Sequence, residues 1–165
     1  MPETRRASVR RGGRRAAGAG ADATRSPDPL TRAERSALMS RIRGADTKPE
    51  LVVRSALHRA GFRFRLHGRS LPGRPDIVLP KYGTVIFVHG CFWHRHGCQL
   101  ASEPRTRRDF WRAKFAANVA RDSRNARALR ALGWRVLTVW ECALRTERSR
   151  ERAVATLIRR LLHPR

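Results

Sequence analysis

Acidic residues are scarce in this sequence of 165 residues, with 13 Asp and Glu against 37 Lys and Arg and a formal net charge of +24. A charge of this size repels itself in the compact state, and a polyanionic partner relieves that repulsion. Residues 1–30 hold seven Arg and three acids, so most of the excess belongs to residues 31–165. The charge therefore predicts nucleic acid as the first candidate partner, with an anionic membrane surface as the second.

Long apolar runs are missing as well. No stretch approaches the roughly 20 apolar residues that a membrane-spanning helix needs, so we expect no membrane partner. No apolar segment follows the N-terminal Arg cluster, which argues against a secretory signal. The three cysteines are odd in number, which argues against a closed disulfide framework. A cytoplasmic protein is the resulting expectation.

Large apolar side chains are almost absent from residues 1–30, where Arg, Ala, Gly and Pro dominate. Such a segment cannot bury enough apolar surface to order itself, so we expect a disordered basic arm. Order is predicted to begin near Thr31, and residues 31–165 are predicted to form a single domain.

Helical and strand patterns alternate after the arm. Capping-box spacings, Thr31 with Glu34 and Thr47 with Glu50, predict two helices. Alternating or continuous apolar residues predict strands over 62–67, 76–80, 84–89 and 134–140. A long helix is expected over 107–133 and a last one over 148–162. This order predicts an α/β fold with helices packed on the faces of a central sheet.

The connections between the strands predict which residues meet. The turn "PKYG" joins strand 76–80 to strand 84–89, so these strands should pair antiparallel, with Asp76 beside Val88 and close to His89. The long helix joins strand 84–89 to strand 134–140, and such a crossover makes the two strands parallel. Their carboxyl ends should then bring Cys91 and Cys142 together.

Cysteine and histidine spacing predicts a metal site at that edge. Cys91, His96 and Cys98 follow the pattern C-x4-H-x-C, and Cys142 arrives from the other strand. Three thiolates and one imidazole make a closed Cys3His set, which is typical of structural zinc. The alternative is that the cysteines are ordinary small core residues.

Asp76 is the only carboxylate between residues 51 and 102. It is either a charge partner for Arg74 or an oxygen ligand for Mg²⁺ at a scissile phosphate. His89 and His94 are correspondingly either surface histidines or groups that transfer protons. Capping alone explains Glu50, and His67 has no predicted role.

Phe92 and Trp93 lie between the expected zinc ligands, in a short arch that can hardly enclose both rings. They either pack on a neighbouring helix or project as a wedge between base steps of a duplex.

Five stretches of the sequence resemble one known family. "MSRIR", "LPGRPDIV", "VIFVHGCFWHRHGC", "FW..K...N..RD" and "LGWRVLTVWECAL" are similar to the very short patch repair (Vsr) DNA mismatch endonucleases, from about Arg32 to Leu144. The resemblance implies a mixed central sheet like that of the type II restriction endonucleases. It also implies a monomer, associated with the nucleoid and functionally linked to a cytosine-5 DNA methyltransferase. The implied reaction is a Mg²⁺-dependent nick in duplex DNA, 5′ to the thymine of a T:G mismatch that arises when 5-methylcytosine deaminates.

The resemblance also implies roles for individual residues. Asp76 would bind Mg²⁺ with the backbone carbonyl of Val88, in a catalytic group with His89, His94 and a supporting Glu50. The implied zinc ligands are Cys91, His96, Cys98 and Cys142. The implied DNA-intercalating residues are Phe92 and Trp93, with Met39 and Ile42 entering from the other groove. Family members often have Thr at the position of Val88, a change that a backbone ligand tolerates.

Two other functions remain open on the sequence. One is a zinc-stabilised DNA-binding module without catalysis, which would not need Asp76, His89 and His94. The other is a restriction-like nuclease without mismatch specificity.

Overall fold

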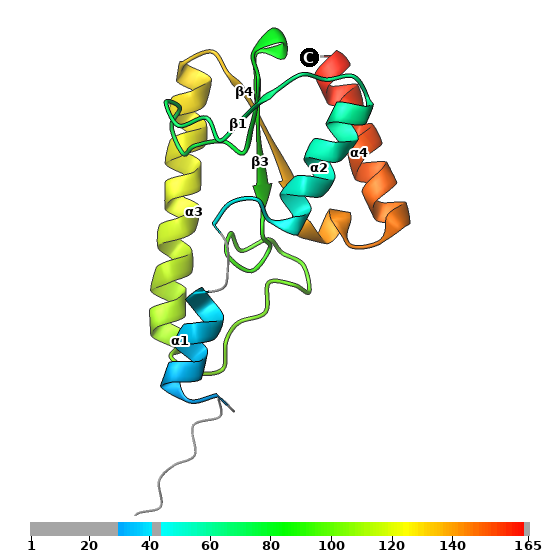
Figure 1. Cartoon of the computed structure of the whole chain (residues 1–165). Coiled ribbons are helices and arrows are strands. Elements are labelled where there is room, and N and C mark those ends of the chain that lie inside the picture. The colour runs from blue at the N-terminus through cyan, green and yellow to red at the C-terminus, as the bar shows by residue number, and fades with distance from the viewer. Residues whose placement is uncertain (1–29, 41–43, 164–165) are drawn as a thin grey trace, which may run out of the picture.

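The computed structural model describes residues 30–40 and 44–163, and residues 1–29 of the predicted basic arm lie outside this part. The elements follow one another in the predicted order (Figure 1). They are α1 (Arg32–Ser40), α2 (Lys48–Arg59), β1 (Arg65–Leu66), β2 (Ile77–Leu79), β3 (Thr84–His89), α3 (Arg108–Ala131), β4 (Arg135–Trp140) and α4 (Glu147–Leu162), with short 3-10 turns at Pro80–Tyr82 and Glu141–Leu144. None of these helices is long and apolar enough to cross a membrane.

The four strands form one mixed sheet in the order β1-β2-β3-β4. β2 and β3 pair antiparallel with Leu79 opposite Thr84 and Val78 opposite Val85, which is the predicted register. β3 and β4 pair in parallel with His89 opposite Trp140, as the crossover connection predicts. The expected α/β fold with a mixed sheet is therefore confirmed.

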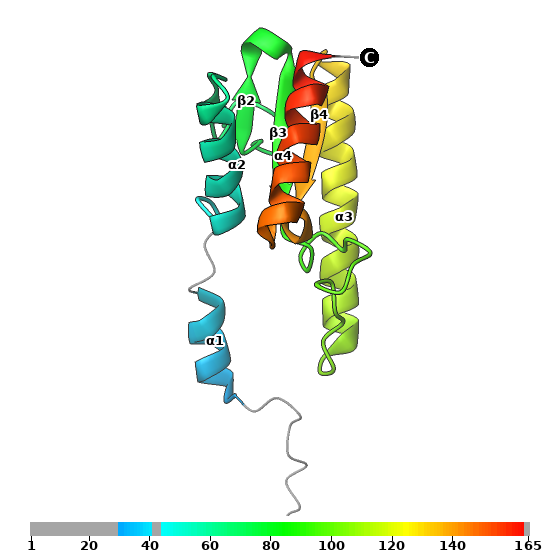
Figure 2. The same ribbon diagram turned by 90° about the vertical axis from the view of Figure 1, so that its right-hand side faces the viewer.

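Helices cover both faces of the sheet (Figure 2). Alternate strand residues point to opposite faces. Ile77 and Leu79 accordingly join the larger core with residues of α2 and α4. Val78 lies in a smaller cluster with Leu129 of α3. In Figure 2, α3 extends well below the sheet, and α1 lies apart from the helices that pack on it.

Two local predictions about the N-terminal half need correction, namely one strand and the second of the two capping boxes. The strand expected over 62–67 is only the pair Arg65–Leu66. Its partner β2 is also short, because Pro80 opens a 3-10 turn and proline cannot donate to a ladder. The capping box at Thr31 is confirmed, since the Thr31 N–H donates to Glu34 Oε2 over 2.8 Å and the Glu34 N–H donates to Thr31 Oγ1 over 3.2 Å.

The second capping box is wrong. The Thr47 side chain makes no capping hydrogen bond; its hydroxyl instead donates to Glu50 Oε1 over 2.8 Å. Glu50 Oε2 accepts from the Asp46 N–H over 3.0 Å and from Arg54 Nη2 over 2.7 Å. The neighbouring guanidinium therefore orients Glu50 differently from a capping glutamate.

Candidate active site and metal cluster

A cleft of about 1230 Å³ opens beside the carboxyl end of β3. Its walls come from the start of α2, the segment before β2, the loop after β3 and the inner side of α3. The titratable groups predicted for catalysis all line it: Glu50, Asp76, His89 and His94. Cations surround them, namely Arg74, Arg95, Lys114, Arg121, Arg127 and Arg130. Such a surface can bind a polyanion next to groups that can bind metal and transfer protons.

Asp76 is held by the backbone of β3. The Val88 N–H donates to Asp76 Oδ2 over 2.7 Å. Val88 is the neighbour of Asp76 that the strand register predicts. Burial raises the pKa of Asp76 to about 6, and the bond from Val88 opposes this shift only in part. A cation bound at this carboxyl would favour its ionised form, because an opposite charge stabilises the carboxylate. Its chemistry thus fits a divalent metal ligand.

Glu50 and His67 accompany Asp76 in a cluster whose ligand atoms all lie within 4.8 Å of one another. Glu50 is only 3% exposed, and its charge is compensated by Arg54. Arg54 also pairs with Asp46, whose carboxylate lies 3.3 Å from His67 Nε2. Glu50 thus does more than a capping residue, and His67, for which no role was predicted, lies beside the candidate metal ligand.

His89 and His94 form a second cluster with Asp122 of α3. The two imidazoles stack with ring centroids 3.8 Å apart and an interplanar angle of 7°. His94 Nδ1 lies 2.6 Å from Asp122 Oδ2. Burial, followed by the charge of His94, lowers the pKa of His89 to about 4, so His89 is neutral at pH 7.

Asp122 is a residue that the sequence analysis missed. The motif "FW..K...N..RD" ends on it, yet no role was assigned to it there. Another residue of that motif, Asn118, is 5% exposed and donates from Nδ2 to the Trp93 carbonyl over 3.0 Å. Both side chains tie the loop after β3 to α3.

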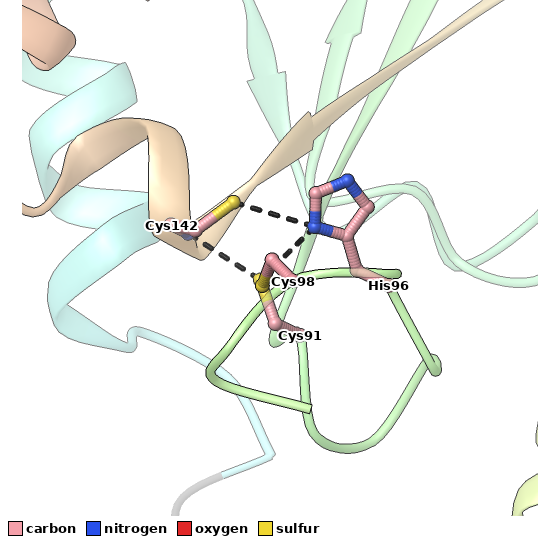
Figure 3. Close-up of side chains that lie close together, drawn as sticks. All are labelled: Cys91, His96, Cys98 and Cys142. Atoms are coloured by element: carbon pink, nitrogen blue, oxygen red, sulfur yellow. Dashed lines mark hydrogen bonds between the residues drawn. The ribbon is translucent and has the colours of Figure 1, made fainter. Parts of the chain in front are cut away.

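The predicted zinc ligands converge at the end of the sheet. Figure 3 shows Cys91, His96 and Cys98 on the loop after β3, with Cys142 reaching them from the turn after β4. His96 Nδ1 lies 3.7 Å from Cys91 Sγ and 3.3 Å from Cys142 Sγ. A tetrahedral zinc ion would place its sulfur and nitrogen ligands about 3.6 Å apart. The donor set and its spacing therefore fit a four-coordinate metal.

The surroundings of the cluster hold it in place. The His96 ring stacks on Trp140 with centroids 4.4 Å apart, and Glu141 Oε2 accepts from the Cys91 N–H over 3.2 Å. Burial raises the pKa of the Cys91 thiol to about 12. Burial would also raise the pKa of Cys98, but hydrogen bonds led by that of His96 lower it to about 7. A thiolate is thus most accessible at Cys98, and metal binding would require the buried Cys91 to lose its proton.

The aromatic pair of the loop packs against α3. The Phe92 ring centroid lies 5.1 Å from that of Phe115 and 5.4 Å from that of Trp111. Trp93 is half-buried and lines the cleft, and its ring centroid lies 6.0 Å from that of Trp111. Of the other two predicted DNA contacts, Met39 is half-buried on α1 and Ile42 lies outside the described residues.

Known proteins resemble this chain over most of its length. The family model "DNA mismatch endonuclease Vsr" matches residues 27–100. "Type II nicking enzyme V.XorIIP" of Xanthomonas oryzae is 53% identical over 117 residues, covering 71% of this chain and 86% of that protein. "DNA mismatch endonuclease Vsr" of Escherichia coli is 52% identical over 118 residues, covering 72% of this chain and 76% of that protein. "Type II nicking enzyme V.NmeAIP" of Neisseria meningitidis is 43% identical over 120 residues, covering 73% of this chain and 86% of that protein. The chain therefore belongs to the Vsr family of DNA mismatch endonucleases.

Proposed function

We propose that this endonuclease nicks duplex DNA 5′ to the thymine of a T:G mismatch, of the kind that deamination of 5-methylcytosine produces, and that it needs Mg²⁺. One observation carries the proposal: Asp76, Glu50 and the His89–His94–Asp122 cluster share a single cleft whose rim is cationic. A DNA-binding module needs the cations but has no use for stacked histidines beside a half-buried carboxyl. The arrangement therefore favours phosphodiester hydrolysis over binding alone.

Mg²⁺ would be held by the Asp76 carboxylate and the backbone carbonyl of Val88, with water completing its shell. When bound there, it would supply charge stabilisation at the scissile phosphate. The fit rests on the donor set, since Asp76 is a half-buried carboxyl whose pKa is raised by burial, and a bound cation would oppose that shift. Glu50 and His67 lie next to it and would orient the water of that shell.

His94 is the group that we assign to proton transfer. Asp122 lies against Nδ1, so Nε2 is the nitrogen that remains to exchange a proton with the attacking water or the leaving oxygen. The neutral His89 stacks on its ring and restricts its orientation. Asp122 thus positions His94 as a carboxylate positions the histidine of other hydrolases.

Zinc is the structural metal that we propose for the cluster of Cys91, His96, Cys98 and Cys142. The set is closed, because all four positions of a tetrahedral ion would be taken by protein ligands. We further propose a fold like that of the type II restriction endonucleases, with residues 31–165 as one domain and residues 1–30 as a basic arm.

Mismatch recognition is assigned to the aromatic side chains. Trp93 lines the cleft while Phe92 packs behind it against α3, and the position of Trp93 supports the proposal that the pair enters a duplex held over the catalytic groups. Met39 and Ile42 would enter from the other groove. A monomer that cooperates functionally with a cytosine-5 DNA methyltransferase completes the proposal.

A nicking assay on labelled duplexes tests it. With Mg²⁺, the protein should cut the thymine strand of a T:G duplex and leave the matched T:A duplex intact. Asp76→Ala should abolish cutting and keep binding to the T:G duplex. Equal cutting of both duplexes would favour the restriction-like nuclease, and binding without cutting by the parent protein would favour the binding module.

A further inference from the structure

β4 is the last strand of the sheet, and no strand in the described part of the chain pairs with its outer edge. Two adjoining cavities of about 1090 and 510 Å³ follow that edge. Arg135, Val136 and Leu137 line the first cavity, and the next three residues of β4 line the second. Successive strand residues face opposite sides of a sheet, so only a space beside the strand contacts them all.

α4 forms the opposite wall. The residues of α4 that line the two cavities are Arg148, Ser149, Arg152, Ala153, Thr156, Leu157, Arg159 and Arg160. Thr156 and Arg160 line both cavities, which therefore join into one groove between β4 and α4. We call this space the β4–α4 groove. It adjoins the side of β4 where Leu137 and Val139 meet α4, whereas α3 packs on the other face.

The groove is strongly cationic. Its arginines are Arg130, Arg135, Arg148, Arg152, Arg159 and Arg160, and no Asp or Glu of the described residues lines it. Arg135 donates from Nη2 to the Arg160 carbonyl, but its Nη1 is buried without a hydrogen-bond partner in the described residues. A buried donor left unpaired costs free energy that an incoming acceptor would relieve.

We propose that the β4–α4 groove binds an extended acidic segment of a partner protein, which pairs with β4 as a fifth strand. The six residues of β4 present about 20 Å of edge, enough for a segment of similar length. Backbone hydrogen bonds would supply affinity, and alternate side chains would supply specificity. Acidic side chains would meet the arginines, and small apolar ones would meet Ala143, Ala153 and Leu157.

The chemistry of the groove favours this occupant over the others. Residues 1–30 carry seven Arg and three acids, so the chain's own arm has the same sign of charge as the groove. A second copy paired edge to edge across a two-fold axis would face the arginines with themselves. A DNA duplex supplies phosphates but no N–H and C=O groups at strand spacing, and it would leave the apolar floor of the groove uncovered.

Peptide binding measured by fluorescence anisotropy tests the proposal. The probe is a labelled peptide of about ten residues in which Glu alternates with Val and Thr. Two comparison peptides carry Lys in place of Glu, or N-methyl groups on alternate backbone nitrogens. The groove variant is R152E/R159E, and the matched control is R59E/R69E, which reverses two exposed arginines that line neither the groove nor the cleft.

The acidic peptide should bind the parent protein, and R152E/R159E should weaken it by about tenfold or more while R59E/R69E changes it by less than about threefold. The Lys peptide should not bind, and N-methylation should weaken binding by about tenfold, because it removes the hydrogen bonds to the edge. R152E/R159E should still nick a T:G duplex like the parent, since neither arginine lines the cleft. This readout separates the groove from the proposed reaction.

Three results would overturn the proposal. The first is no saturable binding of the acidic peptide. The second is equal binding of the N-methylated peptide, which would show charge attraction without strand pairing. The third is a loss of duplex affinity in R152E/R159E as large as the loss of peptide affinity, which would make the groove part of the DNA surface.

Discussion

Cys142→Ser is the change that best tests the metal cluster, because Cys142 is its only ligand from a distant part of the chain. Cys91, His96 and Cys98 share one loop, whereas Cys142 lies 51 residues after Cys91. Parallel pairing of β3 and β4 brings it to that loop in the folded protein. An unfolded chain would have to close the same loop at a cost of about 4 kcal/mol on the chain-entropy model.

This difference sets the size of the expected effect. A zinc ion that uses all four ligands favours the folded chain over the unfolded one by up to about 4 kcal/mol at saturation. For a domain of this size that corresponds to a rise in Tm of about 15 °C. Cys142→Ser leaves three ligands in one short segment, which the unfolded chain offers almost as well. The zinc-dependent part of the free energy of unfolding should therefore fall close to zero.

Urea unfolding, followed with zinc bound and again after chelation, measures the zinc-dependent part of the free energy of unfolding for each protein. Ala143→Ser is the matched control, since it introduces the same side chain one position later and should keep the full dependence on zinc. Cys98→Ser should keep part of the stabilisation by zinc, because the distant link through Cys142 survives. The reasoning fails if Cys142→Ser gains as much from zinc as the parent protein, or if the parent gains nothing.

The remaining predictions concern the cleft. Asp76→Asn should lower single-turnover nicking by about 10³-fold with duplex affinity nearly unchanged, because the carboxylate charge is lost; activity within tenfold of the parent would contradict its assignment. Asp122→Asn should lower kcat by about 10- to 100-fold with little change in KM, because His94 loses its positioning partner; a steady-state assay with equal kcat would exclude that role. Trp93→Ala should weaken binding to a T:G duplex by about 1–3 kcal/mol, as a lost base-stacking contact does, while circular dichroism shows a folded protein. Undiminished affinity would remove Trp93 from the wedge.

The order and pairing of the elements could be predicted because their signals are local. The turn before β3 and the helix before β4 each allow one relative strand direction, and the register follows by counting from the turn. This was enough to bring Asp76 to Val88 and Cys91 to Cys142. The prediction of the fold thus included the parts of the site that depend on strand neighbours alone.

Strand pairing does not predict the position of site residues that depend on how a helix or a loop is placed. Asp122 is one of few acids on an arginine-rich helix, where charge pairing is the ordinary expectation. Only the tilt of α3 against the loop brings it to His94. His67 likewise reaches Asp46 through a loop conformation with φ of 48°, which no periodicity signals. The capping role predicted for Glu50 was wrong because its carboxylate pairs with Arg54, one turn further on, and not with the backbone of Thr47.

The loop after β3 unites tasks that could have been separate. Cys142 anchors it to the end of β4 through the cluster, Asn118 holds the Trp93 carbonyl, and Asp122 holds the His94 ring. The proposed wedge and the proposed proton-transfer group therefore move together with respect to the sheet. A change that loosens any of these ties should affect mismatch binding and cutting at once, because both groups take their position from the same short segment. Mismatch recognition would then align His94 with the phosphate only when the aromatic rings have entered the duplex.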